Sequence, residues 1–120
     1  METAAKILIG LIAIEHLYIL WMEMFAWETA GKRTFKSLPE HLFKPTKALA
    51  ANQGLYNGFL SAGLIWSLCV GDIQWQRNIA LFFLACVAIA GIYGAATASR
   101  RIFFVQALPA IAGLLLVWLK

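Results

Sequence analysis

Residues 7–27, ILIGLIAIEHLYILWMEMFAW, decide the fold class. The stretch is almost entirely apolar, yet it contains Glu15, His16 and Glu23. A run of about 20 apolar residues is long enough to cross the hydrocarbon core of a bilayer as a helix. The stretch is too long for the apolar region of a cleaved signal peptide, and it has no Ala-x-Ala-like cleavage site. We therefore predict a membrane-spanning helix that carries ionisable groups.

The composition of the whole chain supports the same class. Of its 120 residues, 62% are hydrophobic and 13% are charged, against about 45–50% and about 25% in soluble proteins. So few charges cannot cover a water-soluble fold of this size, and disordered chains are poor in hydrophobic residues. We predict one domain over residues 1–120 with four spans: Ile7–Trp27, Ala48–Val70, Asn78–Ala98 and Ile102–Leu119.

Short connections between the spans predict an all-α integral membrane protein, an up-down four-helix bundle. Small residues at four-residue steps let helix backbones approach closely inside lipid, where apolar burial gives little driving force. Two such series occur, one in the second span and one in the third: Gly54, Gly58 and Ala62, and Ala90, Gly94 and Ala98. We expect these faces to be helix contacts.

Positive charges predict the orientation in the membrane. The net charge of +4 comes from ten Lys and Arg residues, which lie mainly in connections, as in membrane proteins and unlike nucleic-acid-binding proteins. Seven of the ten lie on one face: Lys32, Arg33, Lys36, Lys44, Lys47, Arg100 and Arg101. Lys6, Arg77 and Lys120 lie on the other face, so the positive-inside rule places both termini outside the cytoplasm at the inner (plasma) membrane.

The connection between the first two spans predicts a short amphipathic helix at the membrane interface. Ser37 and Glu40 have the spacing of a capping box. The apolar side chains of this helix could then lie on the bilayer while its lysines face anionic lipids. These apolar residues are Leu38, Leu42 and Phe43. A basic loop that only sets the orientation is the alternative.

Polar side chains inside the spans are the candidates for a functional site. Ionisable groups at the membrane centre cost about 2.5–3.5 kcal/mol each and normally face a bundle interior or a wet cavity. We expect these residues to converge on a pocket in the cytoplasmic half of the bundle: Glu15, His16 and Glu23 as catalytic groups, and Asn52, Gln53, Tyr56, Asn57, Tyr93 and Gln106 as ligand-binding groups. Polar contacts that only join helices are the alternative.

The chemistry of such a site is limited by its charges. Lysine and arginine lie too far from the membrane centre to neutralise Glu15 and Glu23, so these groups hold protons, or His16 becomes a cation, or a ligand supplies positive charge. A Glu–His set suits proton transfer. His16 and Glu23 are about 10 Å apart along the axis, whereas zinc ligands lie about 2 Å from the ion. We therefore expect no metal centre and, in the absence of cofactor motifs, no cofactor.

Three polar runs resemble a known family: EHLY at 15–18, EMF at 23–25 and NQGLYNG at 52–58. They are similar to the signature of the small integral-membrane family named domain of unknown function 1304. The resemblance extends over nearly the whole chain, including GIYG at 91–94 and the helix with Gln106 and Pro109. It implies a bacterial or fungal four-helix membrane protein with the polar groups of the first two spans in one site. Members are sometimes labelled epimerases, a label with no known chemistry behind it.

Three functions remain open from the sequence. The first is a pocket that binds, and converts by proton transfer, a small lipophilic or amphipathic molecule. The second is a proton-coupled exporter that resembles the small multidrug-resistance transporters, with Glu15 as the essential acid. The third is a structural or accessory membrane subunit. Membrane lipids are expected partners in each case, a homo-oligomer is compatible with all three, and nucleic acid is not expected.

Overall fold

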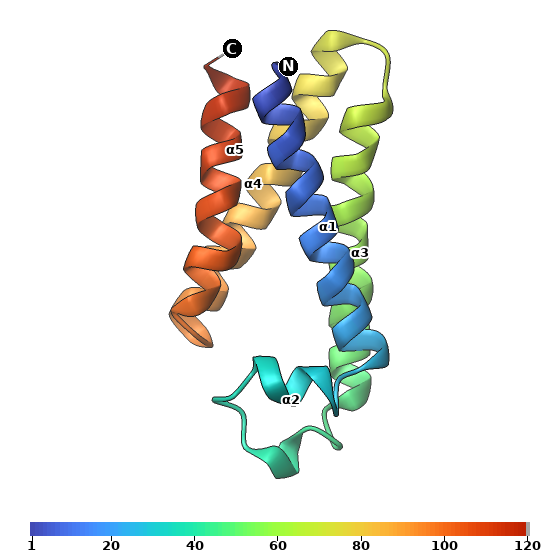
Figure 1. The fold of residues 1–120 in the computed structure, drawn as a ribbon, viewed down its shortest axis with the longest axis vertical. Coiled ribbons are helices and arrows are strands. Elements are labelled where there is room, and N and C mark those ends of the chain that lie inside the picture. The colour runs from blue at the N-terminus through green and yellow to red at the C-terminus, as the bar shows by residue number, and fades with distance from the viewer. Residues whose placement is uncertain (120) are drawn as a thin grey trace. The chain divides into compact units, whose positions relative to one another are not determined.

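The computed structural model describes residues 1–119, and every regular element in that range is helical (Figure 1). The all-α prediction is therefore confirmed. Lys120, counted above among the charges at the termini, lies outside the described residues. The elements in chain order are α1 (Thr3–Phe25), α2 (Ala30–Thr34), a 3₁₀ turn η1 (Glu40–Leu42), α3 (Lys47–Cys69), α4 (Ile73–Thr97), a π-helical turn η2 (Phe103–Ala107) and α5 (Leu108–Trp118).

Two of the helices, α1 and α4, are long and apolar enough to cross a membrane. The helix α3 has 23 residues, as many as α1, but its amide side chains lower its hydropathy. The helical stretch Phe103–Trp118 is apolar and shorter. Length and composition thus support a membrane location through two helices.

The chain forms two compact units. The four-helix unit comprises Met1–Ile14 and the described part of Leu60–Lys120, and the two-helix unit comprises Glu15–Phe59. The helices α1 and α3 each contribute one half to each unit. Most of the expected site residues fall in the two-helix unit.

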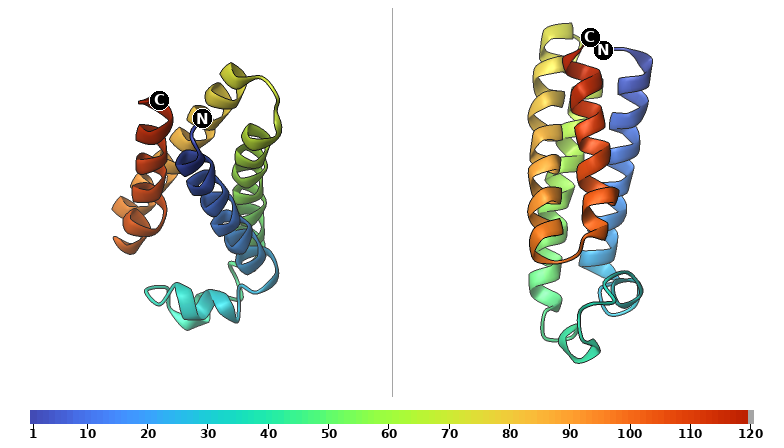
Figure 2. Two further views of the ribbon diagram at one scale, coloured as in Figure 1. Left: turned by 45° about the horizontal axis from the view of Figure 1, so that its top comes forward. Right: turned by 90° about the vertical axis from the view of Figure 1, so that its left-hand side faces the viewer.

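The four-helix unit has a continuous apolar core to which α1, α3, α4 and α5 all contribute. Its buried side chains include Ile9, Ile12, Leu64, Leu84, Val87, Ala110 and Val117. Within this unit α1 begins and α5 ends at the same end, and successive helices alternate in direction (Figures 1 and 2). The up-down order of the four main helices is thus confirmed in this unit.

Close helix contacts in the four-helix unit follow the expected small-residue series at Gly94, where an added Cβ would lie 3.1 Å from Ile102 Cγ2, but not at its alanines. Ala62, Ala90 and Ala98 are exposed. The tight approach is made instead by Gly91, where an added Cβ would lie 2.7 Å from the backbone nitrogen of Ala107. The series in α4 therefore predicted close packing correctly but placed part of it on the wrong face.

Gln106 lies in the π-helical turn η2. The helix α5, which contains Pro109, follows this turn directly. The Leu108 N–H donates to the Phe103 carbonyl in this turn, five residues back. Because Pro109 has no N–H, the carbonyl four residues before it loses its usual donor. A π turn absorbs such an interruption without breaking the helix. The helix thus accommodates Pro109 through a wider turn.

The connection in the two-helix unit differs from the expected interfacial helix. Ser37 does not cap a helix: the turn η1 follows Pro39 and has no side-chain cap. Phe43, expected on the bilayer, is 1% exposed. The predicted capping box is therefore wrong, and the short helix α2, which the spacing did not predict, lies earlier in the connection.

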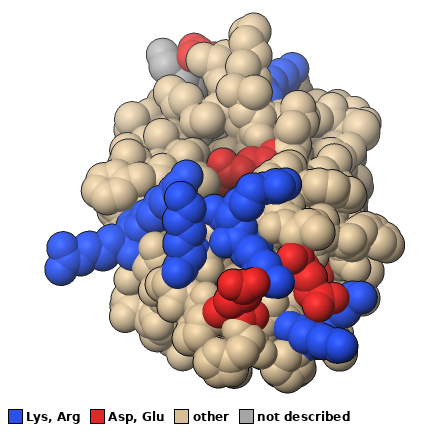
Figure 3. Space-filling view, turned by 60° about the horizontal axis from the view of Figure 1, so that its bottom comes forward, with Lys and Arg blue, Asp and Glu red and all other residues tan. Residues whose placement is uncertain are grey.

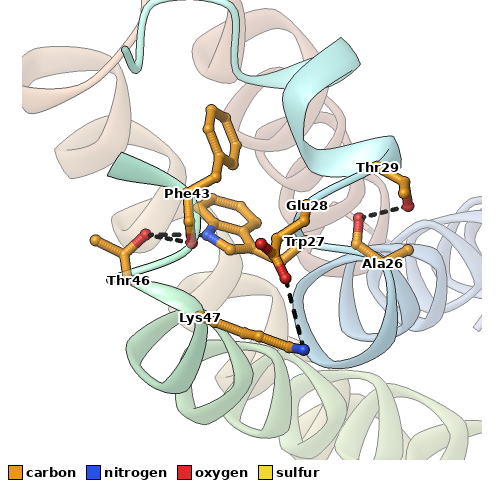
Figure 4. A network of polar contacts seen from close by, with 7 residues as sticks. All are labelled: Ala26, Trp27, Glu28, Thr29, Phe43, Thr46 and Lys47. Atoms are coloured by element: carbon orange, nitrogen blue, oxygen red, sulfur yellow. Dashed lines mark hydrogen bonds and ion pairs between the residues drawn. The ribbon is translucent and has the colours of Figure 1, made fainter. Parts of the chain in front are cut away.

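A cluster around Trp27 holds the connection in place (Figure 4). This cluster explains why the connection differs from the expected interfacial helix. The Trp27 indole N–H donates to Thr46 Oγ1 at 3.0 Å, and its ring centroid lies 5.4 Å from that of Phe35 and 5.0 Å from that of Phe43. A Cβ at Gly31 would lie 2.8 Å from Trp27 Cε3. Trp27 was expected inside the first span, but α1 ends at Phe25 and the indole turns into this cluster.

Candidate functional site

The centre of the site is a partly buried hydrogen bond between α1 and α3. Glu23 is 3% exposed, and Asn57 Nδ2 donates to Glu23 Oε1 at 2.7 Å. The same amide also donates to the backbone carbonyl of Gln53 at 3.2 Å, which orients it along α3. The second carboxyl oxygen, Glu23 Oε2, accepts no hydrogen bond from residues 1–119 of the structure. The pair thus leaves one oxygen of a buried acid without a partner in the chain.

Two glycines bring the helices close enough for this bond. A Cβ at Gly54 would lie 2.8 Å from Met24 Cγ and 3.1 Å from the Leu20 carbonyl oxygen. At Gly58 it would lie 2.5 Å from Leu20 Cδ1. The expectation that Gly54 and Gly58 form a helix contact is confirmed, and this contact is what positions Asn57 opposite Glu23.

The other polar residues of α3 lie beside this pair with their side chains exposed. Asn52 and Gln53 are exposed, and Tyr56 has 56% of its surface accessible. Asn52 Nδ2 donates to the Tyr56 hydroxyl at 3.3 Å. One helix of the two-helix unit therefore carries both the half-buried donor to Glu23 and a row of exposed amide and phenol groups.

The remaining expected residues are divided between the two units. His16 is fully buried. Glu15 Oε1 is also buried and finds no hydrogen-bond partner among residues 1–119. Tyr93, 70% exposed, and the half-buried Gln106 belong to the four-helix unit. Their part in the site stays a prediction, as do the catalytic and binding roles of all these residues.

A second polar feature, not expected from the sequence, lies on the connection of the two-helix unit. A shallow, open depression of about 640 Å³ is lined by Glu28, Lys32, Glu40, His41 and Lys44. The sequence signal that could have indicated a folded connection is its three aromatic residues, Trp27, Phe35 and Phe43, which an extended basic loop does not need. Among residues 1–119, three or more His, Cys, Asp or Glu side chains are nowhere gathered as metal ligands.

Replacing Asn57 with leucine is expected to destabilise the protein by about 1–3 kcal/mol, because the Glu23 carboxyl would stay buried without its donor. Thermal unfolding of the detergent-purified protein, followed by circular dichroism, measures the effect. Asn52→Leu is the control, since its exposed bond should contribute less than about 0.5 kcal/mol. A Glu23→Leu/Asn57→Leu double variant should regain part of the loss. Equal losses for Asn57→Leu and Asn52→Leu would contradict a special role for the partly buried bond.

Comparison with known proteins agrees with the resemblance seen in the polar runs. The model of the family described as "Protein of unknown function (DUF1304)" matches residues 10–118. The chain is 32% identical over 117 residues to the uncharacterized protein YpaA of Lactococcus lactis subsp. lactis (strain IL1403), covering 96% of this chain and 97% of that protein. No solved structure matches. The chain therefore belongs to the DUF1304 family.

Proposed function

We propose that this chain is a four-span protein of the inner (plasma) membrane whose two-helix unit binds a small lipophilic or amphipathic molecule at Glu23. The apolar helices α1 and α4 support the membrane location. Trp66, Trp75 and Trp118 are 57%, 59% and 65% exposed near the end of the four-helix unit where the chain starts, as expected for an interfacial belt. Positive charge in the connections supports an orientation with both termini outside the cytoplasm.

The observation that carries the binding proposal is the buried Glu23 carboxyl group, held by the half-buried Asn57. A carboxyl group in a membrane helix is costly, whereas two neutral amides can join helices at a lower cost. In this pair one carboxyl oxygen is held at 2.7 Å by Asn57, and the other is left for a further donor. An acid fixed in this way can orient a polar group of a ligand, or exchange a proton with it.

Other polar groups of α1 and α3 also suit ligand binding and proton transfer. Asn57 fixes the orientation of Glu23, while Asn52, Gln53 and Tyr56 offer exposed hydrogen-bonding groups on the same helix. Glu15 and His16, on α1, are further acid and base groups. Isomerisation by proton transfer between Glu23 and a bound molecule would need no cofactor. We propose that chemistry for the site, with binding as its first step.

Glu23→Gln is expected to lower the amount of co-purified small molecule by about tenfold, corresponding to about 1.4 kcal/mol of binding. The glutamine carbonyl can still accept from Asn57, so the unfolding midpoint should change little. Native mass spectrometry of the purified protein measures bound mass directly. Glu28→Gln is the matched control, because Glu28 pairs with Lys47 on the connection. Bound mass that is the same in both variants and in the unchanged protein would contradict the proposal.

One observation favours the exporter as a second candidate. Glu15 lies in the middle of α1 with a buried oxygen that has no hydrogen-bond partner in the described chain, as a proton-carrying acid would. Proton flux in liposomes, driven by a lipophilic cation such as ethidium and abolished by Glu15→Gln, would support export. Retained binding of the co-purified molecule without flux would support the binding site.

A further inference from the structure

The connection of the two-helix unit is a folded surface. We name residues 28–47 the basic cap. The Trp27 cluster anchors it at both ends, through Gly31 and Phe35 after α1 and through Phe43 and Thr46 before α3. Figure 3 shows Lys and Arg side chains gathered on one face of the molecule with a few acidic side chains among them. In the cap, the positive charges are therefore held on an ordered scaffold.

The cap has more positive charge than its own acids can neutralise. It contains five basic residues and two acidic ones besides His41. Lys32 pairs with Glu40 at 3.5 Å, and Lys47 pairs with Glu28 at 3.6 Å. Arg33, Lys36 and Lys44 are exposed and form no ion pair with any residue of the described chain. Three cations are left for a partner outside the chain.

The open depression on the cap gives an anion access to its lysines. The open depression is lined by Lys32 and Lys44 together with His41, and its two carboxylates, Glu28 and Glu40, each have a lysine partner. Lysine and arginine donate charge-assisted hydrogen bonds to phosphate oxygens. A phosphate group could therefore approach Lys44 without breaking either ion pair.

We propose that the basic cap binds the phosphodiester headgroup of an anionic phospholipid. The inference rests on the membrane location proposed above, because a connection between two spanning helices lies at the level of the headgroups. Clusters of Lys and Arg directly beside a spanning helix attract anionic lipids there. The leaflet next to the cap is also the source of phosphate at the highest local concentration.

The test compares two lipids on the intact protein. The protein, purified in a neutral detergent, is mixed with equal amounts of phosphatidylglycerol and phosphatidylcholine of identical acyl chains, and native mass spectrometry counts the adducts. We expect an excess of phosphatidylglycerol adducts of about tenfold. Arg33→Gln/Lys36→Gln/Lys44→Gln should bring the ratio close to one. Lys6→Gln/Arg100→Gln/Arg101→Gln removes the same charge elsewhere and should keep the excess.

Several results would overturn the proposal. No preference in the unchanged protein, or an equal loss in both triple variants, would leave no role for the cap beyond net charge. Displacement of the lipid by inorganic phosphate would make it a site for free anions. Preferential capture of RNA by the cap would indicate a different class of partner.

Failure of this inference can be told apart from failure of the proposed function. Glu23→Gln should keep the lipid preference, because Glu23 is not part of the cap. Release of the protein from membranes by alkaline carbonate would contradict the membrane location itself. Retention in the carbonate pellet without a lipid preference would contradict the cap proposal alone.

Discussion

Replacing Gly54 with leucine is expected to separate α1 from α3 in the two-helix unit and to lower the stability of the protein by about 3 kcal/mol or more. The first side-chain carbon alone would lie 3.1 Å from the Leu20 carbonyl oxygen and 3.0 Å from Glu23 Cβ. The backbone oxygen cannot move aside without displacing α1. The better helix propensity of leucine returns only about 1 kcal/mol. The Glu23–Asn57 bond should be lost with the contact.

The unfolding midpoint, measured by circular dichroism in detergent, should fall by more than about 10 °C. Gly10→Leu is the matched control, because a Cβ at Gly10 meets no atom within 4 Å. Gly58→Leu should fall between the two, since the nearest atom there is the flexible end of Leu20. A midpoint for Gly54→Leu equal to that of Gly10→Leu would show that the helices do not approach closely at Gly54.

The helices themselves could be predicted from the sequence because their signal is local. Long apolar stretches with few breaks predict helices directly. The observed helix boundaries differ from the expected ones mainly where a capping residue sets the end of the helix. The start of α4 is one case: Asp72 accepts a hydrogen bond from the Trp75 N–H at 3.0 Å, so the helix begins at Ile73, five residues before the expected start of the span at Asn78. Its end at Thr97 is within one residue of the expectation.

The helix contacts could be predicted only in part, because a spacing of four does not say which face is covered. Gly54 and Gly58 do pack as expected, whereas Ala62, one turn later in the same series, is exposed. In α4, Gly94 lies close to Ile102 as expected, whereas the closer approach, to the backbone of Ala107, is at Gly91, next to the expected residue Ala90. Which side a neighbouring helix occupies depends on the whole bundle, and no single helix encodes it.

For the site, too, the sequence predicted which residues take part better than how those residues are arranged. The cost of polar groups inside a membrane pointed to both Glu23 and Asn57 as residues of one site, but nothing in the sequence predicted that these two would be hydrogen-bonded to each other. The bond itself depends on rotamers and on the Gly54 contact. Asn52 and Gln53 are exposed. Asn52 points about 140° away from Asn57 around the helix axis, but Gln53, four residues before Asn57, shares its face, so spacing alone did not separate Gln53 from Asn57.

The connection was the least predictable part, because its structure depends on contacts between residues far apart in the chain. The capping-box spacing of Ser37 and Glu40 is a short-range signal. The packing of Phe43 against Trp27, 16 residues away in the sequence, determines the structure there instead. Proline at position 39 also fixes the backbone ahead of the turn η1. Aromatic residues in a basic connection are thus the better indication of a folded segment.

Replacing Trp27 with alanine is expected to unfold the basic cap, at a cost of about 3–5 kcal/mol. The indole is 9% exposed and contacts aromatic rings from both parts of the cap, Phe35 and Phe43. The substitution would also remove the hydrogen bond that the indole N–H donates to Thr46 Oγ1 at 3.0 Å. Limited trypsin digestion should then cut much faster after Lys32, Arg33 and Lys36, because an unfolded segment exposes the peptide bonds that follow these residues.

Two controls separate the causes of this effect. Trp27→Phe keeps an aromatic ring but loses the indole N–H, so it should cost more than the lost bond alone, about 1 kcal/mol, and less than Trp27→Ala. Trp66→Ala removes a tryptophan that is 57% exposed and should leave the digestion rate unchanged. If the cap binds lipid because it is folded, Trp27→Ala must also lower the phosphatidylglycerol preference while leaving every charge in place. A Trp27→Ala protein that resists trypsin and keeps that preference would mean that the cap is held by contacts other than this cluster.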